Sequence, residues 1–104
     1  MTQLQNVSII KKANIYFDGK VTSRTVLFPD GTKKTLGIML PGEYEFSTDL
    51  KEEMDILAGK LDYKLTGQDW KTIEGSGVFY VPANETFQLK VHTTTDYCCS
   101  YLNE

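Results

Sequence analysis

Residues 42–59, GEYEFSTDLKEEMDILAG, predict the fold class of this chain. The first part alternates charged and aromatic residues up to Thr48, which is typical of a β-strand with one buried face. The apolar residues 54–58 predict a second strand that ends at Gly59. The polar segment between them fits a turn as well as one short helix. The stretch therefore indicates two consecutive strands joined by a charged connection.

The rest of the chain repeats this pattern of short strands and turns. Runs rich in Val, Ile, Thr, Tyr and Phe alternate with turn residues, which indicates an all-β sandwich or barrel. Every second residue is apolar in KLDYKL (60–65) and TFQLKVH (86–92), so each of these strands buries one face. The predicted strands are 15–17, 20–28, 34–40, 43–48, 54–58, 60–66, 70–73, 78–81, 86–92 and 96–102.

Composition bounds the domain organisation and the kinds of partner. The chain has 104 residues, of which 24% are charged, and a formal net charge of −3. We expect residues 14–104 to form one barrel domain and residues 1–13 a loosely ordered, flexible N-terminal extension. The lack of excess positive charge predicts no nucleic-acid polymer as partner. Without a run of roughly 20 apolar residues or a signal-peptide pattern, we expect a cytoplasmic protein with no membrane partner.

The cysteines and the histidine carry little functional signal. Cys98 and Cys99 are adjacent within a predicted strand, so their side chains point to opposite faces and are poorly placed to form a disulfide. Reduced thiols fit the cytoplasm. The single histidine, His92, falls on the polar face of its strand, and we expect it to be exposed and without a function.

The spacing within residues 42–59 and 75–87 resembles that of the two metal-binding motifs of the cupin barrel family. Other residues stand where those motifs carry histidine, namely Phe46, Thr48 and Phe87. Of the metal ligands, only the glutamate of the first motif is present, as Glu53, and Gly59 occupies the glycine position of that motif. These side chains do not supply the ligand set that Zn²⁺ or Fe²⁺ requires. The resemblance implies a jelly-roll-like, cupin-type β-barrel, and the missing ligands predict no metal and no other cofactor.

Four longer stretches carry a closer resemblance: NIYFDGKVTS (14–23), GIMLPGEYEFST (37–48), EEMDILAGKLDYKL (52–65) and VFYVPANETFQLKV (78–91). In this order and spacing they are similar to the pyrimidine/purine nucleoside phosphorylase family of small, single-domain bacterial cupins. The resemblance implies a pentosyltransferase that cleaves purine and pyrimidine nucleosides with inorganic phosphate as co-substrate, giving free base and pentose 1-phosphate. Compared with that family, we expect this chain to carry an additional N-terminal segment.

Such a reaction needs an anion site, a contact to the ribose and a contact to the leaving base. For phosphate, the candidates are the hydroxyl and backbone N–H groups of Ser47 and Thr48, with positive charge from Arg24 or Lys20. Glu53 is the candidate acceptor for two ribose hydroxyls, because a carboxylate can accept both hydrogen bonds. Thr48 and Glu53 are thus the candidate catalytic residues. The candidates for stacking on the base are Tyr44, Phe46, Phe79, Phe87 and Tyr97.

Each of these assignments has an alternative. Arg24 and Lys20 fit exposed strand residues, Glu53 fits a surface carboxylate beside Glu52, and the aromatic rings fit a hydrophobic core. The whole chain fits a non-enzymatic, metal-free cupin that binds a small sugar or nucleotide ligand. A metal-dependent oxygenase or isomerase is disfavoured by the missing ligands. We expect a homodimer, because the strand 78–81 is apolar on both faces.

Overall fold

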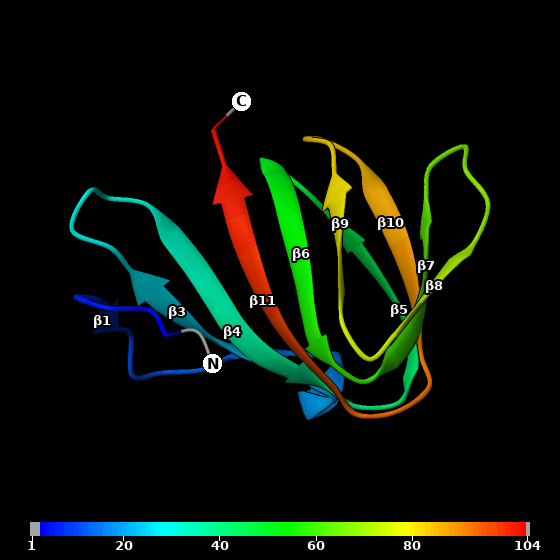
Figure 1. The fold of residues 1–104 in the computed structure, drawn as a ribbon, viewed down its shortest axis with the longest axis horizontal. Coiled ribbons are helices and arrows are strands. Elements are labelled where there is room, and N and C mark those ends of the chain that lie inside the picture. Colours follow the sequence, from blue (N-terminus) through cyan, green and yellow to red (C-terminus); the bar gives the residue numbers. More distant parts are fainter. Residues whose placement is uncertain (1–2, 104) are drawn as a thin grey trace.

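The computed structural model describes residues 3–103, and they fold almost entirely into strands (Figure 1). The only helical element among them is one 3₁₀ turn, so the all-β prediction is confirmed. The elements are β1 (Ser8–Ile9), β2 (Asn14–Tyr16), η1 (Phe17–Gly19), β3 (Val21–Leu27), β4 (Lys33–Met39), β5 (Gly42–Ser47), β6 (Lys51–Ala58), β7 (Lys60–Leu65), β8 (Lys71–Glu74), β9 (Gly77–Val81), β10 (Thr86–Val91) and β11 (Thr95–Leu102).

The strands form two antiparallel sheets. The larger sheet has the order β1-β3-β4-β11-β6-β9, with β2 also paired to β3, and the smaller has the order β5-β10-β7-β8. In Figure 1 the larger sheet runs from β3 and β4 on the left to β9, and the smaller sheet lies on the right. The chain crosses between the sheets after β4, β5, β6, β8, β9 and β10. Consecutive strands thus often lie in opposite layers.

The core lies between the two sheets, as the alternation of apolar residues predicts. Leu61 is buried on β7, and Phe87, Leu89 and Val91 are buried on β10. Their neighbours Gln88 and Lys90 are turned away from the core. Full burial of one such large apolar side chain contributes about 1.5–3 kcal/mol. The period-two pattern therefore fixes which face of each strand is internal.

Two segments differ from the sequence prediction. Part of the expected extension joins the larger sheet, because Ser8 and Ile9 pair with Leu27 and Val26 of β3. The strand β6 begins at Lys51 and not at Met54, so a charged segment expected to be a turn is extended. Its charged side chains hid it from a search for apolar runs, but pairing with β11 continues as far as Lys51. This early start decides which acidic residue faces inward.

Candidate active site

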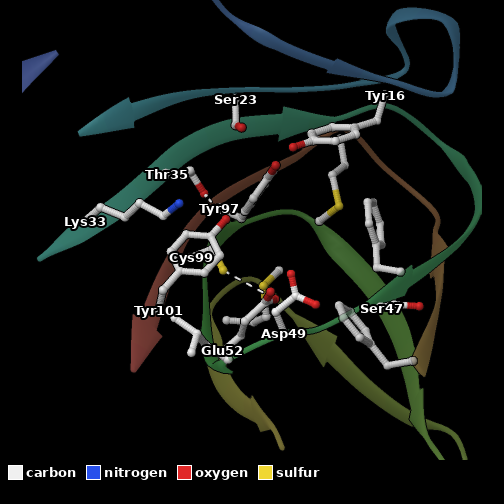
Figure 2. Close-up of a pocket in the computed structure, with 15 residues that line it drawn as sticks. Tyr16, Ser23, Lys33, Thr35, Ser47, Asp49, Glu52, Tyr97, Cys99 and Tyr101 are labelled. Atoms are coloured by element: carbon white, nitrogen blue, oxygen red, sulfur yellow. Dashed lines mark hydrogen bonds between the residues drawn. The ribbon is translucent and has the colours of Figure 1, made fainter. Parts of the chain in front are cut away.

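A cavity of about 370 Å³ opens between the two sheets. Its walls come from β3, β4, β5, β6, β10 and β11, with Tyr16 of β2 at one side. Figure 2 shows that polar side chains dominate the labelled part of this wall. They include hydroxyls, two carboxylates and one amine: Ser23, Lys33, Thr35, Ser47, Asp49, Glu52, Tyr97 and Tyr101. A cavity of this size, lined by both polar and apolar side chains, is typical of a small-molecule site.

Hydroxyl groups line the β4–β11 side of the cavity. Thr35 Oγ1 and Tyr101 OH share a hydrogen bond of 3.3 Å, and Tyr97 OH donates to the backbone oxygen of Thr22 at 3.5 Å. Burial raises the pKa of Tyr97 to about 12 and also raises the pKa of Tyr101. Both phenols therefore stay protonated near neutral pH. Tyr97 uses its O–H for Thr22, whereas Tyr101 can donate to an anionic or hydroxyl-bearing ligand when it accepts from Thr35.

A glycine lets the Tyr97 hydroxyl occupy this position. Gly37 lies opposite both Tyr97 and Ser23 in the sheet. A Cβ at residue 37 would overlap the backbone oxygen of Thr22 and lie 2.8 Å from the Tyr97 hydroxyl. The missing side chain is therefore needed for the close approach of β3, β4 and the phenol.

Glu52 is a partly buried carboxylate of the cavity wall. Burial raises its pKa, the nearby charge of Asp49 acts in the same direction, and a hydrogen bond from Cys99 opposes them. Cys99 Sγ donates this bond to Oε1 over 3.5 Å (Figure 2). The pKa of the Cys99 thiol is itself raised, mainly by burial, so the sulfur remains a protonated donor and not a nucleophile.

Aromatic and apolar side chains form the other part of the wall. Phe46 and Phe87 stack with ring centroids 5.8 Å apart and an angle of 26° between the rings. Tyr16 meets Phe46 edge-on at 6.2 Å, and Met39 and Met54 also line the cavity. Flat rings and polarisable thioethers offer a surface to an aromatic heterocycle without demanding one pattern of hydrogen bonds.

A left-handed turn follows Tyr16, which lines the aromatic side of the cavity. Phe17, Asp18 and Gly19 have positive φ angles of 51°, 56° and 91°. An aromatic residue rarely adopts this conformation, and its cost is offset here by packing. The Phe17 ring lies 5.0 Å from Tyr44 and 5.4 Å from Phe46. The turn thereby holds Tyr16 beside the cavity.

Four of the residues proposed from the sequence line the cavity: Phe46, Ser47, Phe87 and Tyr97. Two other aromatic candidates are core residues outside it. Tyr44 OH donates to the backbone oxygen of Leu40 at 2.6 Å, and Phe79 stacks on Tyr63 with centroids 3.9 Å apart. The aromatic candidates therefore divide between the cavity wall and the core that supports it.

Thr48, Glu53 and the two basic candidates lie away from the cavity. Thr48 is buried, and its hydroxyl donates to the backbone oxygen of Pro82 at 2.7 Å. Its backbone N–H donates to the oxygen of Glu85 at 2.9 Å. Arg24 is exposed, with Nε donating to the backbone oxygen of Lys11, and Lys20 is exposed as well. Glu53 follows Glu52 on β6 and so points to the opposite face of the sheet.

Several cavity residues were missed from the sequence, above all Glu52, Lys33 and Tyr101. A signal for Glu52 was present. Met54 and Ile56 share the buried face of β6, and extending this face by two residues reaches Glu52. Lys33 and Tyr101 lie at strand ends, where alternation alone does not tell whether a side chain faces a cavity or solvent.

The structure also shows where the two cysteines and the histidine lie. Cys98 and Cys99 are both free and buried, and Cys99 faces the cavity while Cys98 faces the outer side of the sheet. The prediction of opposite faces is confirmed. His92 is exposed as expected, but its Nε2 lies 2.8 Å from Asp62 Oδ2. This surface pair joins the residue after β10 to Asp62 of β7 and lies outside the cavity.

Within residues 3–103, no group of three or more His, Cys, Asp or Glu side chains is arranged to hold a metal ion. The same residues contain no helix with the length and apolar character needed to cross a membrane. The expected absence of a cofactor stays a prediction.

Solved structures define the class of protein. A protein of unknown function from Acinetobacter sp. ADP1 superposes with a TM-score of 0.91 at 38% identity, covering 96% of this chain and 98% of that one. The cupin domain of Schizosaccharomyces pombe Cnp3 superposes with a TM-score of 0.65 at 16% identity, covering 86% of this chain and 64% of that one, and so shows the fold alone. The chain is a cupin-type, jelly-roll-like all-β protein with an internal cavity.

Sequence comparisons define the family. The profile of the family described as pyrimidine/purine nucleoside phosphorylase matches residues 11–101. A pyrimidine/purine nucleoside phosphorylase of Chlorobium chlorochromatii is 61% identical over 102 residues, which cover 98% of this chain and 99% of the relative. The chain belongs to the pyrimidine/purine nucleoside phosphorylase family. Because this alignment includes the N-terminal segment, the expectation that the segment is additional is wrong for such relatives.

Proposed function

We propose that this protein is a nucleoside phosphorylase, a pentosyltransferase that cleaves purine and pyrimidine nucleosides with inorganic phosphate. The observation that carries the proposal is a cavity with one aromatic and one polar side in a chain of this family. Its products are the free base and pentose 1-phosphate. The proposal requires no resident metal or organic cofactor, since phosphate is the second substrate.

The aromatic side of the cavity suits the base. Phe46 and Phe87 present ring faces, and stacking on an aromatic side chain contributes about 1–3 kcal/mol per base. Every nucleobase has such a face, so a site that relies on stacking accepts purines and pyrimidines. We therefore expect broad specificity for the base, because stacking on this wall does not require recognition of any single ring atom.

Glu52 suits the ribose and takes the role that the sequence assigned to Glu53. As a carboxylate on the cavity wall, it can accept hydrogen bonds from two neighbouring ribose hydroxyls. Positive charge develops on the sugar as the bond to the base lengthens, and a nearby negative charge stabilises it. Partial burial strengthens this effect, because solvent screens the interaction less.

The proposed step balances without a further reactant. A phosphate oxygen forms a bond to C1′ while the bond between C1′ and the base nitrogen breaks. The electron pair of the broken bond stays with the base, which gains one proton. Hydrogen phosphate loses one proton in forming the ester. The cavity contributes by holding the two substrates in reacting positions and by excluding water from C1′.

The first test measures free base released from adenosine, guanosine, uridine, cytidine and thymidine, with and without inorganic phosphate. The protein is assayed both untreated and after treatment with EDTA. Release from both classes of nucleoside that requires phosphate supports the proposal. Release without phosphate would indicate a hydrolase, and loss of release after EDTA would indicate a metal-dependent enzyme. No release from any nucleoside would favour a non-enzymatic protein that binds a sugar or nucleotide.

We also propose that two copies associate in the cytoplasm as a homodimer. Val78 and Tyr80 on the outer face of β9 are 49% and 50% exposed, and Leu57 of the neighbouring strand is exposed as well. These apolar side chains lie beside Glu53 and Asp55 on the same face, and covering them with a second copy removes them from water. Sedimentation velocity tests this directly, and a monomer at micromolar concentration would contradict it.

A further inference from the structure

We propose that Lys33, with the hydroxyls of Thr35 and Tyr101, forms the phosphate-binding end of the cavity. This inference rests on the proposed phosphorylase function and names the group that holds its second substrate. None of the phosphate candidates from the sequence supplies a positive charge here, because Arg24 and Lys20 are exposed elsewhere.

Among the described residues that line the cavity, Lys33 alone carries a positive charge. Its side chain extends along the β4 wall toward Thr35 and Tyr101 (Figure 2). The ammonium nitrogen lies 4.9 Å from the centroid of the Tyr101 ring. Among residues 3–103 no carboxylate forms an ion pair with it. The charge is thus available to an anion that enters the cavity.

Two hydroxyls lie beside this charge. Thr35 Oγ1 and Tyr101 OH are 3.3 Å apart, and Tyr101 is held in its protonated form by burial. One hydroxyl of this pair donates to the other, which leaves one O–H free. A phosphate ion accepts hydrogen bonds at every oxygen, so it can receive one from this free hydroxyl and another from the ammonium group. Lys33, Thr35 and Tyr101 thus form a cluster of hydrogen-bond donors for an anion, and none of the three carries a negative charge.

The position of this cluster fits the order of the substrates. In Figure 2 Glu52 lies between Lys33 on one side and Ser47 on the other. Ser47 adjoins Phe46, which belongs to the aromatic wall proposed for the base. With the base at Phe46 and the ribose at Glu52, phosphate at Lys33 approaches the sugar from the side away from the base. That direction is the one required for displacement of the base at C1′.

The neighbouring residue provides a matched control. Lys34 is the next residue on β4, faces the outer side of the sheet, and lies over the Phe28 ring at 5.9 Å. We compare Lys33→Met with Lys34→Met, because both remove one charge and keep the length of the side chain. Lys33→Met should raise KM for phosphate about tenfold or more, with KM for the nucleoside changed by less than about twofold. Lys34→Met should leave both constants near those of the wild type, and Lys33→Arg should retain most of the phosphate affinity.

The readouts separate failure of this inference from failure of the proposed function. If the wild type cleaves nucleosides with phosphate and Lys33→Met shows an unchanged KM for phosphate, the assignment of Lys33 is wrong and the phosphorylase stands. If the wild type cleaves no nucleoside, the proposed function fails. Titration calorimetry with inorganic phosphate then still tests the anion site: binding lost only in Lys33→Met supports it, and equal binding in both variants overturns it. Circular dichroism checks that each variant is folded.

Discussion

The thiol of Cys99 donates a 3.5 Å hydrogen bond to Oε1 of Glu52, joining β11 to β6 inside the cavity. The next residue along β6, Glu53, faces the opposite side of the sheet. Two adjacent carboxylates of the same length therefore lie in different environments, one in the cavity and one outside it. This contrast provides the sharpest test of the proposed site.

Glu52→Gln should lower turnover by about tenfold or more, because the neutral amide keeps the shape but loses the negative charge near the sugar. Glu53→Gln is the matched control and should stay within about twofold of the wild-type rate. Steady-state rates of base release at saturating phosphate measure both. A loss in Glu53→Gln with a normal Glu52→Gln would restore the assignment made from the sequence.

The raised pKa of Glu52 predicts a pH-dependent stability difference. A carboxyl whose pKa is higher in the folded than in the unfolded protein stabilises the fold fully at low pH, and this contribution is lost as pH rises through the folded pKa. Gln at this position is neutral at every pH. Glu52→Gln should therefore gain stability relative to the wild type as the pH rises above about 4.5, the ordinary pKa of glutamate, in urea unfolding. A difference that does not change with pH would contradict the burial of a titrating carboxyl.

Phe46→Ala tests the proposed stacking of the base. Loss of one aromatic contact of about 1–3 kcal/mol should raise KM by about 5- to 150-fold for a purine and for a pyrimidine nucleoside alike. Phe46→Leu keeps an apolar side chain and separates the loss of the ring from the loss of volume. An effect on only one class of nucleoside would argue against a shared stacking wall.

Thr48→Ala tests whether this residue has a catalytic or a structural role. The variant loses the hydroxyl that bonds to the backbone of Pro82 and Glu85, so stability should fall by about 1–3 kcal/mol. Turnover per folded molecule should remain near that of the wild type, and Thr48→Ser should restore stability. Chemical unfolding and rate measurements on the same samples separate the two roles. Unchanged stability with a strongly reduced rate would favour catalysis.

The fold was predictable because the apolar alternation survives in most strands. Leu61 on β7 and the inward residues of β10 follow it directly, and the neighbouring polar residues face outward. The start of β6 was not predictable from apolar runs, because Lys51, Glu52 and Glu53 are all charged. Their strand conformation depends on pairing with β11, which is distant in sequence. Extending the strand to Lys51 continues the alternation of Met54 and Ile56, which places Glu52 and not Glu53 on the internal face.

The site was only partly predictable, for a related reason. Spacing and aromatic character led to Phe46 and Phe87, which do line the cavity. The assignment of Lys33 requires knowing that the end of β4 lies beside Tyr101, and these residues are far apart in the chain. Thr48 was proposed because it occupies a histidine position of the cupin motif. Its hydroxyl and backbone N–H groups are instead hydrogen-bonded to backbone oxygens of a neighbouring loop. Local sequence indicates residue types, and the sheet pairings decide which of them meet.

The most direct test of the proposed function follows a single nucleoside by ³¹P NMR, which measures the inorganic phosphate consumed and the pentose 1-phosphate formed. Chromatography of the same samples measures the free base released. The proposal predicts one pentose 1-phosphate formed and one phosphate lost for each base released, with both rates reduced together in Glu52→Gln. Base release without consumption of phosphate would contradict phosphorolysis. Equal rates in wild type and Glu52→Gln would contradict the role of this cavity residue.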